Sequence, residues 1–268
     1  MAKQMKHQQF QCCYQNWVAQ QRLDLDELLQ ALTHYPTDLD YLQLMTKKSL
    51  SHLENYKNTR AQLAKHDGPS FMAPSWGSTF ENSFLWIGGC RASLIIRLVY
   101  ALCGSQLNAH LEDFLEGVRH GNLGEISSLQ LKKIDELHAN TIKDENKLSS
   151  HERIADDPLV LLANEGTGVR EASKDEVVDK AMDAHARDMY SVLIEADKLR
   201  MSTLKGMLEI LTPLQAVEFL VASKKLHLSL HEWSTRRDVR MGITQLLGSN
   251  NPSSSGDPPP PLPPSPEP

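Results

Sequence analysis

Residues 84 to 93 read Phe-Leu-Trp-Ile-Gly-Gly-Cys-Arg-Ala-Ser, and this stretch decides how the chain folds. Bulky apolar residues beside paired glycines are not typical of a solvent-facing helix, so the stretch predicts the buried start of a helix. Apolar residues continue to position 102 and indicate a central helix over residues 79–103, surrounded by other helices. Gly104 is placed to end that helix as a C-cap.

A helical period also dominates the sequence on both sides of this stretch. Thr212 is a natural N-cap and Pro213 a natural first-turn residue, so a last helix should begin there and end before Gly248. No segment predicts a strand, and a broken region is expected over residues 149–174. The sequence therefore predicts an all-α fold, a single bundle of about six to eight helices. The expected helices are residues 8–32, 38–65, 79–103, 107–118, a long segment from 125, 175–211 and 213–247.

The chain divides into a helical domain and a proline-rich tail. Its 268 residues are 40% hydrophobic, enough to bury a substantial core, and nothing marks a boundary inside residues 1–248. The tail, residues 249–268, holds nine of the fourteen prolines and is expected to be disordered or polyproline II. It is either a solubilising extension or a segment that docks on an aromatic groove.

Composition excludes several classes of function. A formal net charge of -6 argues against a dedicated nucleic-acid surface, and no stretch approaches the roughly 20 apolar residues that cross a bilayer. Four cysteines without CxxC spacing, and the lack of an apolar leader, favour a reducing intracellular compartment. No catalytic motif, phosphate-binding glycine loop or zinc spacing is present, so we do not expect an enzyme.

Two histidines, His227 and His231, stand four residues apart in the predicted last helix and therefore share one of its faces. This spacing suits two ligands of one metal or cofactor, and it also suits two ordinary histidines at the edge of a core. The helical wheel predicts a core-facing stripe with His227 on its flank and His231 nearer to solvent. That stripe is Phe219, Ser223, Leu226, Leu230 and Trp233.

The first helix carries an aromatic stripe formed by Phe10, Tyr14, Trp17 and Val18. Such a stripe packs in a core or, with Tyr and Trp as anchors, occupies the groove of a partner. The sequence leaves both interpretations open.

The quoted stretch resembles the DOG domain of plant delay-of-germination proteins, which is also found in TGA-type bZIP transcription factors. Cys90 and Ala92 stand where the TGA-like pattern has Phe and Pro, and residues 97–106 and 224–233 are closer to the dormancy branch. The resemblance covers roughly residues 8–247. It implies a regulator of seed dormancy and germination, located in the nucleus and cytoplasm.

The resemblance also implies haem binding at the positions of His227 and His231. Two imidazoles on one face of one helix cannot easily be trans ligands of one iron. We therefore expect one of them to ligate the haem iron and the other to orient it or hold a propionate, with Lys224 or Arg236 as propionate partners. Zinc held by the same pair is a competing interpretation that needs a third, unidentified ligand.

In the dormancy branch the first helix is associated with type 2C protein phosphatases of abscisic-acid signalling, through a segment ending in Tyr-x-x-Trp. Tyr14 to Trp17 resembles that segment, so Tyr14, Trp17 and Val18 are the expected partner-binding residues. Self-association is a further expectation, whereas sequence-specific DNA binding is not, because no basic region is present. The alternatives are transcriptional regulation through a DNA-binding partner and a helical domain that binds a fatty-acid-like ligand.

Overall fold

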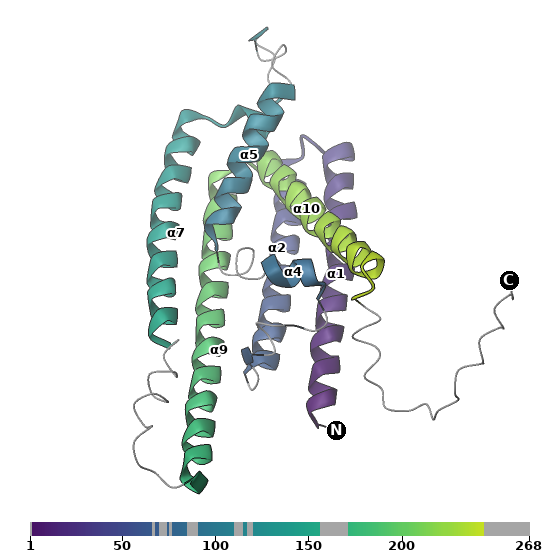
Figure 1. Ribbon diagram of the computed structural model, residues 1–268. Helices are drawn as coiled ribbons and strands as arrows, with labels where there is room; N and C mark the ends of the chain where they lie inside the picture. The colour runs from purple at the N-terminus through teal and green to yellow at the C-terminus, as the bar shows by residue number, and fades with distance from the viewer. Residues whose placement is uncertain are drawn as a thin grey trace, which may run out of the picture.

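The computed structural model describes residues 2–65, 68–69, 74, 77–84, 91–109, 115–116, 120–155 and 171–243 (Figure 1). Every element in this part of the chain is a helix, which confirms the all-α prediction. The elements are α1 (Ala2–His34), α2 (Leu39–Ala64), α4 (Thr79–Phe84), α5 (Ser93–Ala109), the 3-10 turn η2 (Leu123–Glu125), α7 (Ser128–Ala155), α9 (Glu171–Ile210) and α10 (Pro213–Arg240).

The long helices α1, α2, α7 and α9 run in roughly the same direction, and α10 runs obliquely to them across α2 and α1 (Figure 1). α7 packs along α9, while α1 packs against both α2 and α10. The short helix α4 lies against α10. The last helix therefore contacts α1, α2, α4 and α5, and it joins the two ends of the chain in one bundle.

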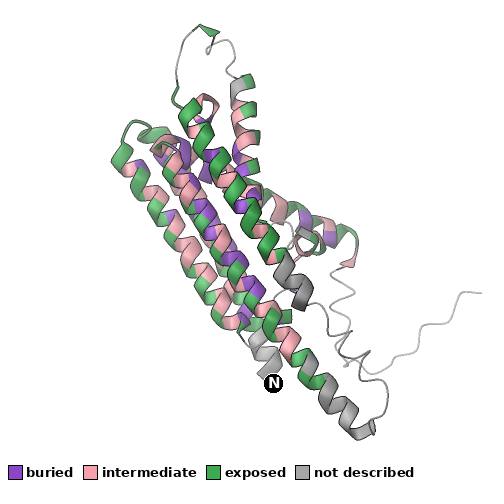
Figure 2. Cartoon of the chain, turned by 90° about the vertical axis from the view of Figure 1, so that its left-hand side faces the viewer, coloured by how far each residue is buried: buried purple, intermediate pink, exposed green. Residues whose placement is uncertain are grey.

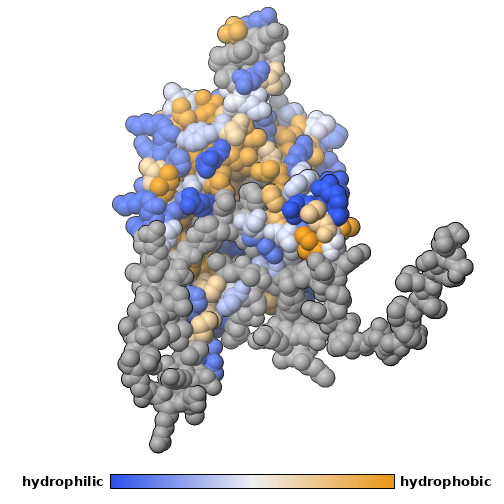
Figure 3. Space-filling model, viewed as in Figure 1, coloured by the Kyte–Doolittle hydropathy of each residue, from blue (hydrophilic) through white to orange (hydrophobic). Residues whose placement is uncertain are grey.

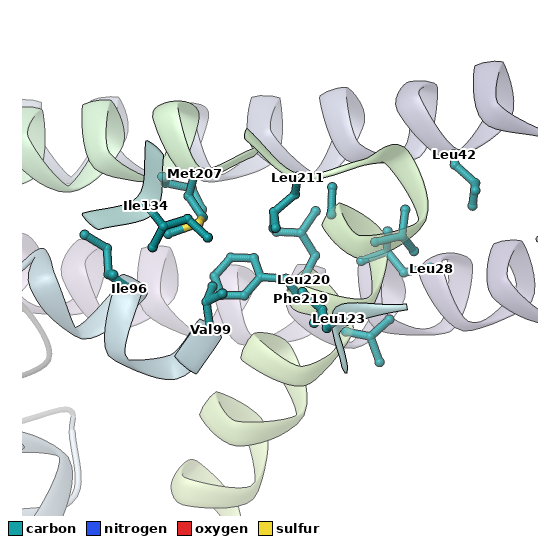
Figure 4. Close-up of a cluster of buried hydrophobic side chains, with 14 of the residues drawn as sticks. Leu28, Leu42, Ile96, Val99, Leu123, Ile134, Met207, Leu211, Phe219 and Leu220 are labelled. Atoms are coloured by element: carbon teal, nitrogen blue, oxygen red, sulfur yellow. The ribbon is translucent and has the colours of Figure 1, made fainter. Parts of the chain in front are cut away.

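The core lies where α10 meets the other helices. Figure 2 shows buried residues along the inward faces of the helices, and Figure 4 shows Phe219 of α10 near the middle of the largest apolar cluster. Both Phe219 and Leu42 are almost fully buried. Fully burying a side chain of this size stabilises the fold by about 1.5–3 kcal/mol. The cluster draws on α1, α2, α5, η2, α7, α9 and α10.

Two predicted helix starts are confirmed, and a side chain caps each of them. The Asp38 side chain accepts a hydrogen bond from the Tyr41 backbone at the start of α2. Thr212 and Gln215 form a capping box at the start of α10, with Pro213 in the first turn. These caps satisfy backbone N–H groups that would otherwise lack partners.

Three predicted boundaries are wrong. Residues 79–103 form not one helix but two separate elements, α4 and α5. Gly104 does not end the helix but lies inside α5, which continues to Ala109. A Cβ at this position would meet no atom within 4 Å, so no close contact requires a glycine there. α10 ends at Arg240, where Met241 caps it and Gly242 follows with a φ of +70°.

α5 is also less enclosed than its apolar sequence predicts. Ile96 and Val99 are fully buried, but Arg97, Ala101 and Gly104 are exposed. The helix therefore lies at the edge of the bundle with one buried face.

The buried face of α10 differs from the predicted stripe. Leu226 and Trp233 are 57% and 44% exposed, whereas Lys224 is only 5% exposed and Leu228 is buried. The helix is rotated relative to the hydrophobic wheel because its polar residues have partners on other helices. Figure 3 shows the polar C-terminal end of α10, where Val239 and Met241 are also exposed.

Several segments with a predicted structure lie outside the described residues. This applies to positions 85–90 of the opening stretch, to most of 107–118, to the centre of the broken region, to Gly248 and to the tail 249–268. The helix that follows the opening stretch begins at Ser93. Within the described part, no helix has the length and apolar character needed to span a membrane.

Candidate functional site

A cavity of about 350 Å³ lies between α1, α2, α4, α9 and α10, with Ile95 of α5 at its edge. Apolar side chains line much of it, and several polar side chains converge on the same space. A concave, largely apolar cavity with a few convergent polar groups is typical of small-molecule sites. Its apolar lining includes Leu50, Leu53, Met201, Leu204, Phe219 and Leu230.

A buried ion pair between α1 and α10 forms one side of the cavity. The Lys224 Nζ atom lies 2.8 Å from Asp24 Oδ2 and 3.2 Å from Gln21 Oε1. His52 Nδ1 lies 2.7 Å from Asp24 Oδ1, so α2 contributes to the same cluster. Burial opposes ionisation of Asp24, but the hydrogen bond and charge of Lys224, together with hydrogen bonds from Gln20 and His52, hold the carboxyl pKa below its ordinary value.

Stacked rings continue this side of the cavity toward α9. Trp17 stacks on Tyr56 with ring centroids 4.5 Å apart and planes only 6° from parallel. Lys224 lies over the Trp17 ring and Arg60 over the Tyr56 ring. Arg60 also pairs with Asp197 of α9. The aromatic rings therefore lie between two paired cations, an arrangement that fixes their orientation.

Glu81 of α4 connects three parts of the site. Its Oε1 atom accepts from the Tyr14 hydroxyl at 2.6 Å and lies 2.7 Å from His231 Nδ1. Its other oxygen, Oε2, accepts from the backbone and hydroxyl of Ser78. Although burial opposes ionisation, these hydrogen bonds lower the pKa of Glu81 to about 2. The carboxylate is therefore charged at neutral pH.

α4 is held to α10 at its first residue. The Thr79 backbone and hydroxyl donate to the Asp238 carboxylate at 2.8 and 2.6 Å. The reciprocal bonds between Ser78 and Glu81 form a capping box that starts this short helix. The anchoring places Glu81 and Asn82 beside the cavity.

His227 lines the cavity and lacks the close carboxylate contact that His231 makes with Glu81. Its Nδ1 atom is buried and has no hydrogen-bond partner among the described residues. Burial lowers the pKa of His227 to about 4, against a smaller opposing effect of Glu81. The imidazole is therefore neutral at physiological pH, which is the form that binds metals.

The structure brings most of the predicted site residues together. Tyr14, Trp17, Lys224 and His227 line the cavity, and His231 reaches it through Glu81. Trp17 is turned toward the cavity rather than outward, and Val18 is 4% exposed within the fold.

Two predicted cofactor residues have different surroundings from those expected. Lys224 is occupied by Asp24 and Gln21 and is not available to a propionate. Arg236 is exposed outside the cavity and donates from Nε to the Glu232 carbonyl of its own helix.

Sequence reasoning missed Glu81, Lys57 and Gln21. For Glu81 a signal was present, because Ser78 and Glu81 have the spacing of a capping box. Lys57 and Gln21 are polar positions in long helices, and nothing local distinguishes them from exposed ones. Among the described residues, no three His, Cys, Asp or Glu side chains are grouped so that they could hold a metal ion.

Comparison with known proteins places this arrangement in a family. Residues 24–101 match the family described as "DOG1: Seed dormancy control". "Protein DOG1-like 1" of Arabidopsis thaliana is 37% identical over 86% of this chain and 90% of its own length. "Protein DOG1-like 3" of the same plant is 36% identical over 87% of this chain and 86% of its own length. The chain belongs to the DOG1-like family.

The family assignment confirms the resemblance on which the sequence analysis relied, including its seed-dormancy branch. A more distant relative is "Transcription factor TGA6" of Arabidopsis thaliana, 24% identical over 85% of this chain and 62% of its own length. The matched segment 24–101 contains Asp24, Lys57 and Glu81, whereas both histidines lie beyond it.

Burial of neutral His227 should make stability depend on pH. A histidine whose pKa falls from 6.5 in the unfolded chain to about 4 in the folded protein stabilises the fold fully above pH 6.5. That stability is lost as the pH falls through this window, by at most about 1.4 kcal/mol per pH unit. His227→Leu should therefore flatten the decline of the free energy of unfolding, measured by urea denaturation between pH 6.5 and 4.

The matched control is His34→Leu, because His34 is exposed at the end of α1. This variant should keep the slope of the unmodified protein. Parallel stability curves for the protein and for His227→Leu would contradict the buried, neutral state.

Proposed function

We propose that this protein regulates seed dormancy and germination by binding rather than by catalysis. Its ligand is haem, and its partners are type 2C protein phosphatases of abscisic-acid signalling, in the nucleus and cytoplasm. Membership of the DOG1-like family supports the dormancy role. The contact between Glu81 and His231 carries the haem proposal, because a carboxylate that orients an imidazole is the usual support of a metal ligand.

The residues beside the cavity fit haem binding. A proton on His231 Nδ1 is donated to Glu81 and leaves Nε2 with a free lone pair. Haem would supply the iron that such a nitrogen coordinates. Glu81 thereby fills the orienting role that the sequence analysis gave to the second histidine. His227 adds a neutral imidazole one turn away on the same helix face.

In this proposal Arg236 binds a haem propionate. Lys224 is buried in its pair with Asp24, and removing it would leave that carboxylate buried without a partner. Arg236 lies on α10 five residues after His231 and is exposed. A guanidinium suits a carboxylate because it can donate two parallel hydrogen bonds.

Haem titration of single variants tests the coordination. His231→Ala should lower haem affinity at least about tenfold and change the Soret band, because it removes the iron ligand. Glu81→Gln should weaken affinity by about 10–100-fold, the usual effect of losing the partner of a metal ligand. His34→Ala is the control and should behave as the unmodified protein. Unchanged affinity and spectrum in both His231→Ala and His227→Ala would refute the proposal.

Phosphatase binding is assigned to the outward face of the Tyr14–Trp17 segment. Tyr14 and Trp17 are engaged by Glu81 and Tyr56 inside the fold. Gln15 and Asn16 are exposed on the opposite side of the same turn of α1. The aromatic residues then hold the segment in place, and the polar residues between them contact the partner.

Calorimetry with an abscisic-acid-pathway type 2C phosphatase tests this assignment. The double variant Gln15→Arg, Asn16→Arg introduces charge and bulk on the surface without disturbing the core, and should abolish binding. Gln30→Arg, also exposed on α1, is the matched control and should bind normally. Equal affinity of the two variants would exclude this face of α1 as the phosphatase site.

A second candidate function is the binding of an apolar ligand in the cavity. The space of about 350 Å³ and its lining of leucine, methionine and phenylalanine favour this reading. A fatty-acid-like molecule would match the apolar part of the surface.

A further inference from the structure

Three residues that line the same cavity each carry a buried polar atom without a hydrogen-bond partner. Within the described part of the chain, the buried side-chain nitrogen and oxygen atoms that lack partners are Gln21 Nε2, Asn82 Oδ1 and His227 Nδ1. All three residues line the cavity, from α1, α4 and α10 respectively. Gln21 is only 5% exposed, so water does not easily replace the missing hydrogen-bond partner of its side chain.

Leaving such groups unpaired is costly. Each buried donor or acceptor without a partner costs about 1–3 kcal/mol, and folded proteins rarely tolerate several together. Their convergence on one space therefore points to a molecule that pairs with them there.

The orientation of each side chain defines what that molecule must offer. Gln21 Oε1 accepts a hydrogen bond from Lys224, which leaves the Nε2 donor without an acceptor. Asn82 Nδ2 donates to the Pro74 carbonyl at 2.6 Å, which leaves Oδ1 as an unmet acceptor. His227 Nδ1 can donate or accept, depending on its tautomer. The ligand must bring both an acceptor and a donor, as a hydroxyl group does.

The charges around the cavity leave a cation unbalanced. Arg60 pairs with Asp197, Lys224 pairs with Asp24, and the Glu81 carboxylate is taken by His231 and Tyr14. Lys57 of α2 also lines the cavity, yet it makes no hydrogen bond or ion pair with the rest of the described chain. Its ammonium group is available to an anion.

The size of the cavity limits the ligand to a compact molecule. A volume of about 350 Å³ is near the lower end of the range of about 300–1,000 Å³ found for small-molecule sites. The three polar atoms belong to residues of α1, α4 and α10, and Lys57 of α2 adds a charged group to the lining, so a ligand must offer polar groups at more than one point. A long unbranched chain with one polar end would leave most of them unpaired.

We propose that the cavity binds a compact, largely apolar carboxylic acid that carries a second polar group such as a hydroxyl. Lys57 pairs with the carboxylate, and Gln21, Asn82 and His227 bind the second polar group. The proposal rests on the second candidate function above and narrows its ligand class from a fatty-acid-like chain to a compact oxygenated acid.

Competition with a fluorescent reporter tests the ligand class. The full chain is titrated at pH 7 with 1-anilinonaphthalene-8-sulfonate, and four competitors then displace it: 6-hydroxy-2-naphthoate, 2-naphthoate, 2-naphthol and palmitate. The hydroxy acid should displace the reporter at a concentration at least about tenfold lower than 2-naphthol, and lower than 2-naphthoate. A naphthol as potent as the acids, or palmitate as the strongest competitor, would overturn the proposal.

Two lysine variants of α2 assign the carboxylate contact. Lys57→Met should remove the advantage of the acids over 2-naphthol, whereas Lys47→Met, at an exposed position, should keep it. Equal behaviour of the two variants would refute the role of Lys57.

Haem titration of Lys57→Met separates this proposal from the haem proposal. The variant should keep the Soret band of the unmodified protein, because His231 and Glu81 are intact. Loss of acid selectivity with haem binding retained supports the assignment of Lys57, and loss of both would overturn it. If the unmodified protein does not bind haem, the haem proposal fails, and the displacement assay with the four competitors still tests the acid proposal.

Discussion

The buried ion pair between Asp24 and Lys224 is the constraint on which the site depends. It sets how α1 and α10 are rotated toward each other, since both charges must reach the same buried point. Residues at intervals of three and seven positions lie on one helix face. Gln21 and Trp17 therefore turn toward the cavity with Asp24, and His227 does so with Lys224. His231, on the same face, contacts Glu81 of α4. Separating the partners would leave a charge buried, at a cost of about 3–5 kcal/mol.

Apolar packing and polar interactions stabilise different parts of the bundle. Around Phe219 and Leu42, α10 packs into an apolar core that supplies most of the stability. Further along α10 the contacts become polar, through Lys224 to α1, through His231 to Glu81, and through Asp238 to α4. The cavity lies at the transition between these two regions. It can therefore offer both an apolar surface and unpaired polar atoms to one ligand.

The all-α fold and the capped helix starts could be predicted because they depend on neighbours in the sequence. Asp38 and Thr212 cap helices whose first turns follow directly. The buried face of α10 could not be predicted in the same way. Lys224 is buried because Asp24, two hundred residues earlier, neutralises it, and a hydrophobic wheel places a lysine on the surface. Leu226 and Trp233 are exposed as a result of that rotation.

The same contrast between local signals and tertiary contacts explains which features of the site could be predicted from the sequence. The spacing of His227 and His231 is local and was visible in the sequence. The different surroundings of the two imidazoles come from α4 and from the cavity, and only the tertiary structure brings these parts together. Tyr14 and Trp17 were recognised as a stripe, while their inward orientation depends on Glu81 and Tyr56.

Hydrogen exchange of the intact protein with and without saturating haemin tests most directly whether haem binds at the histidine pair of α10. The account predicts new protection in the segments that surround it, residues 10–24, 79–84 and 220–233, with no change in α7, which does not line the cavity. Protection confined to α7, or none in α1, α4 and α10 while haemin is bound, would contradict the account.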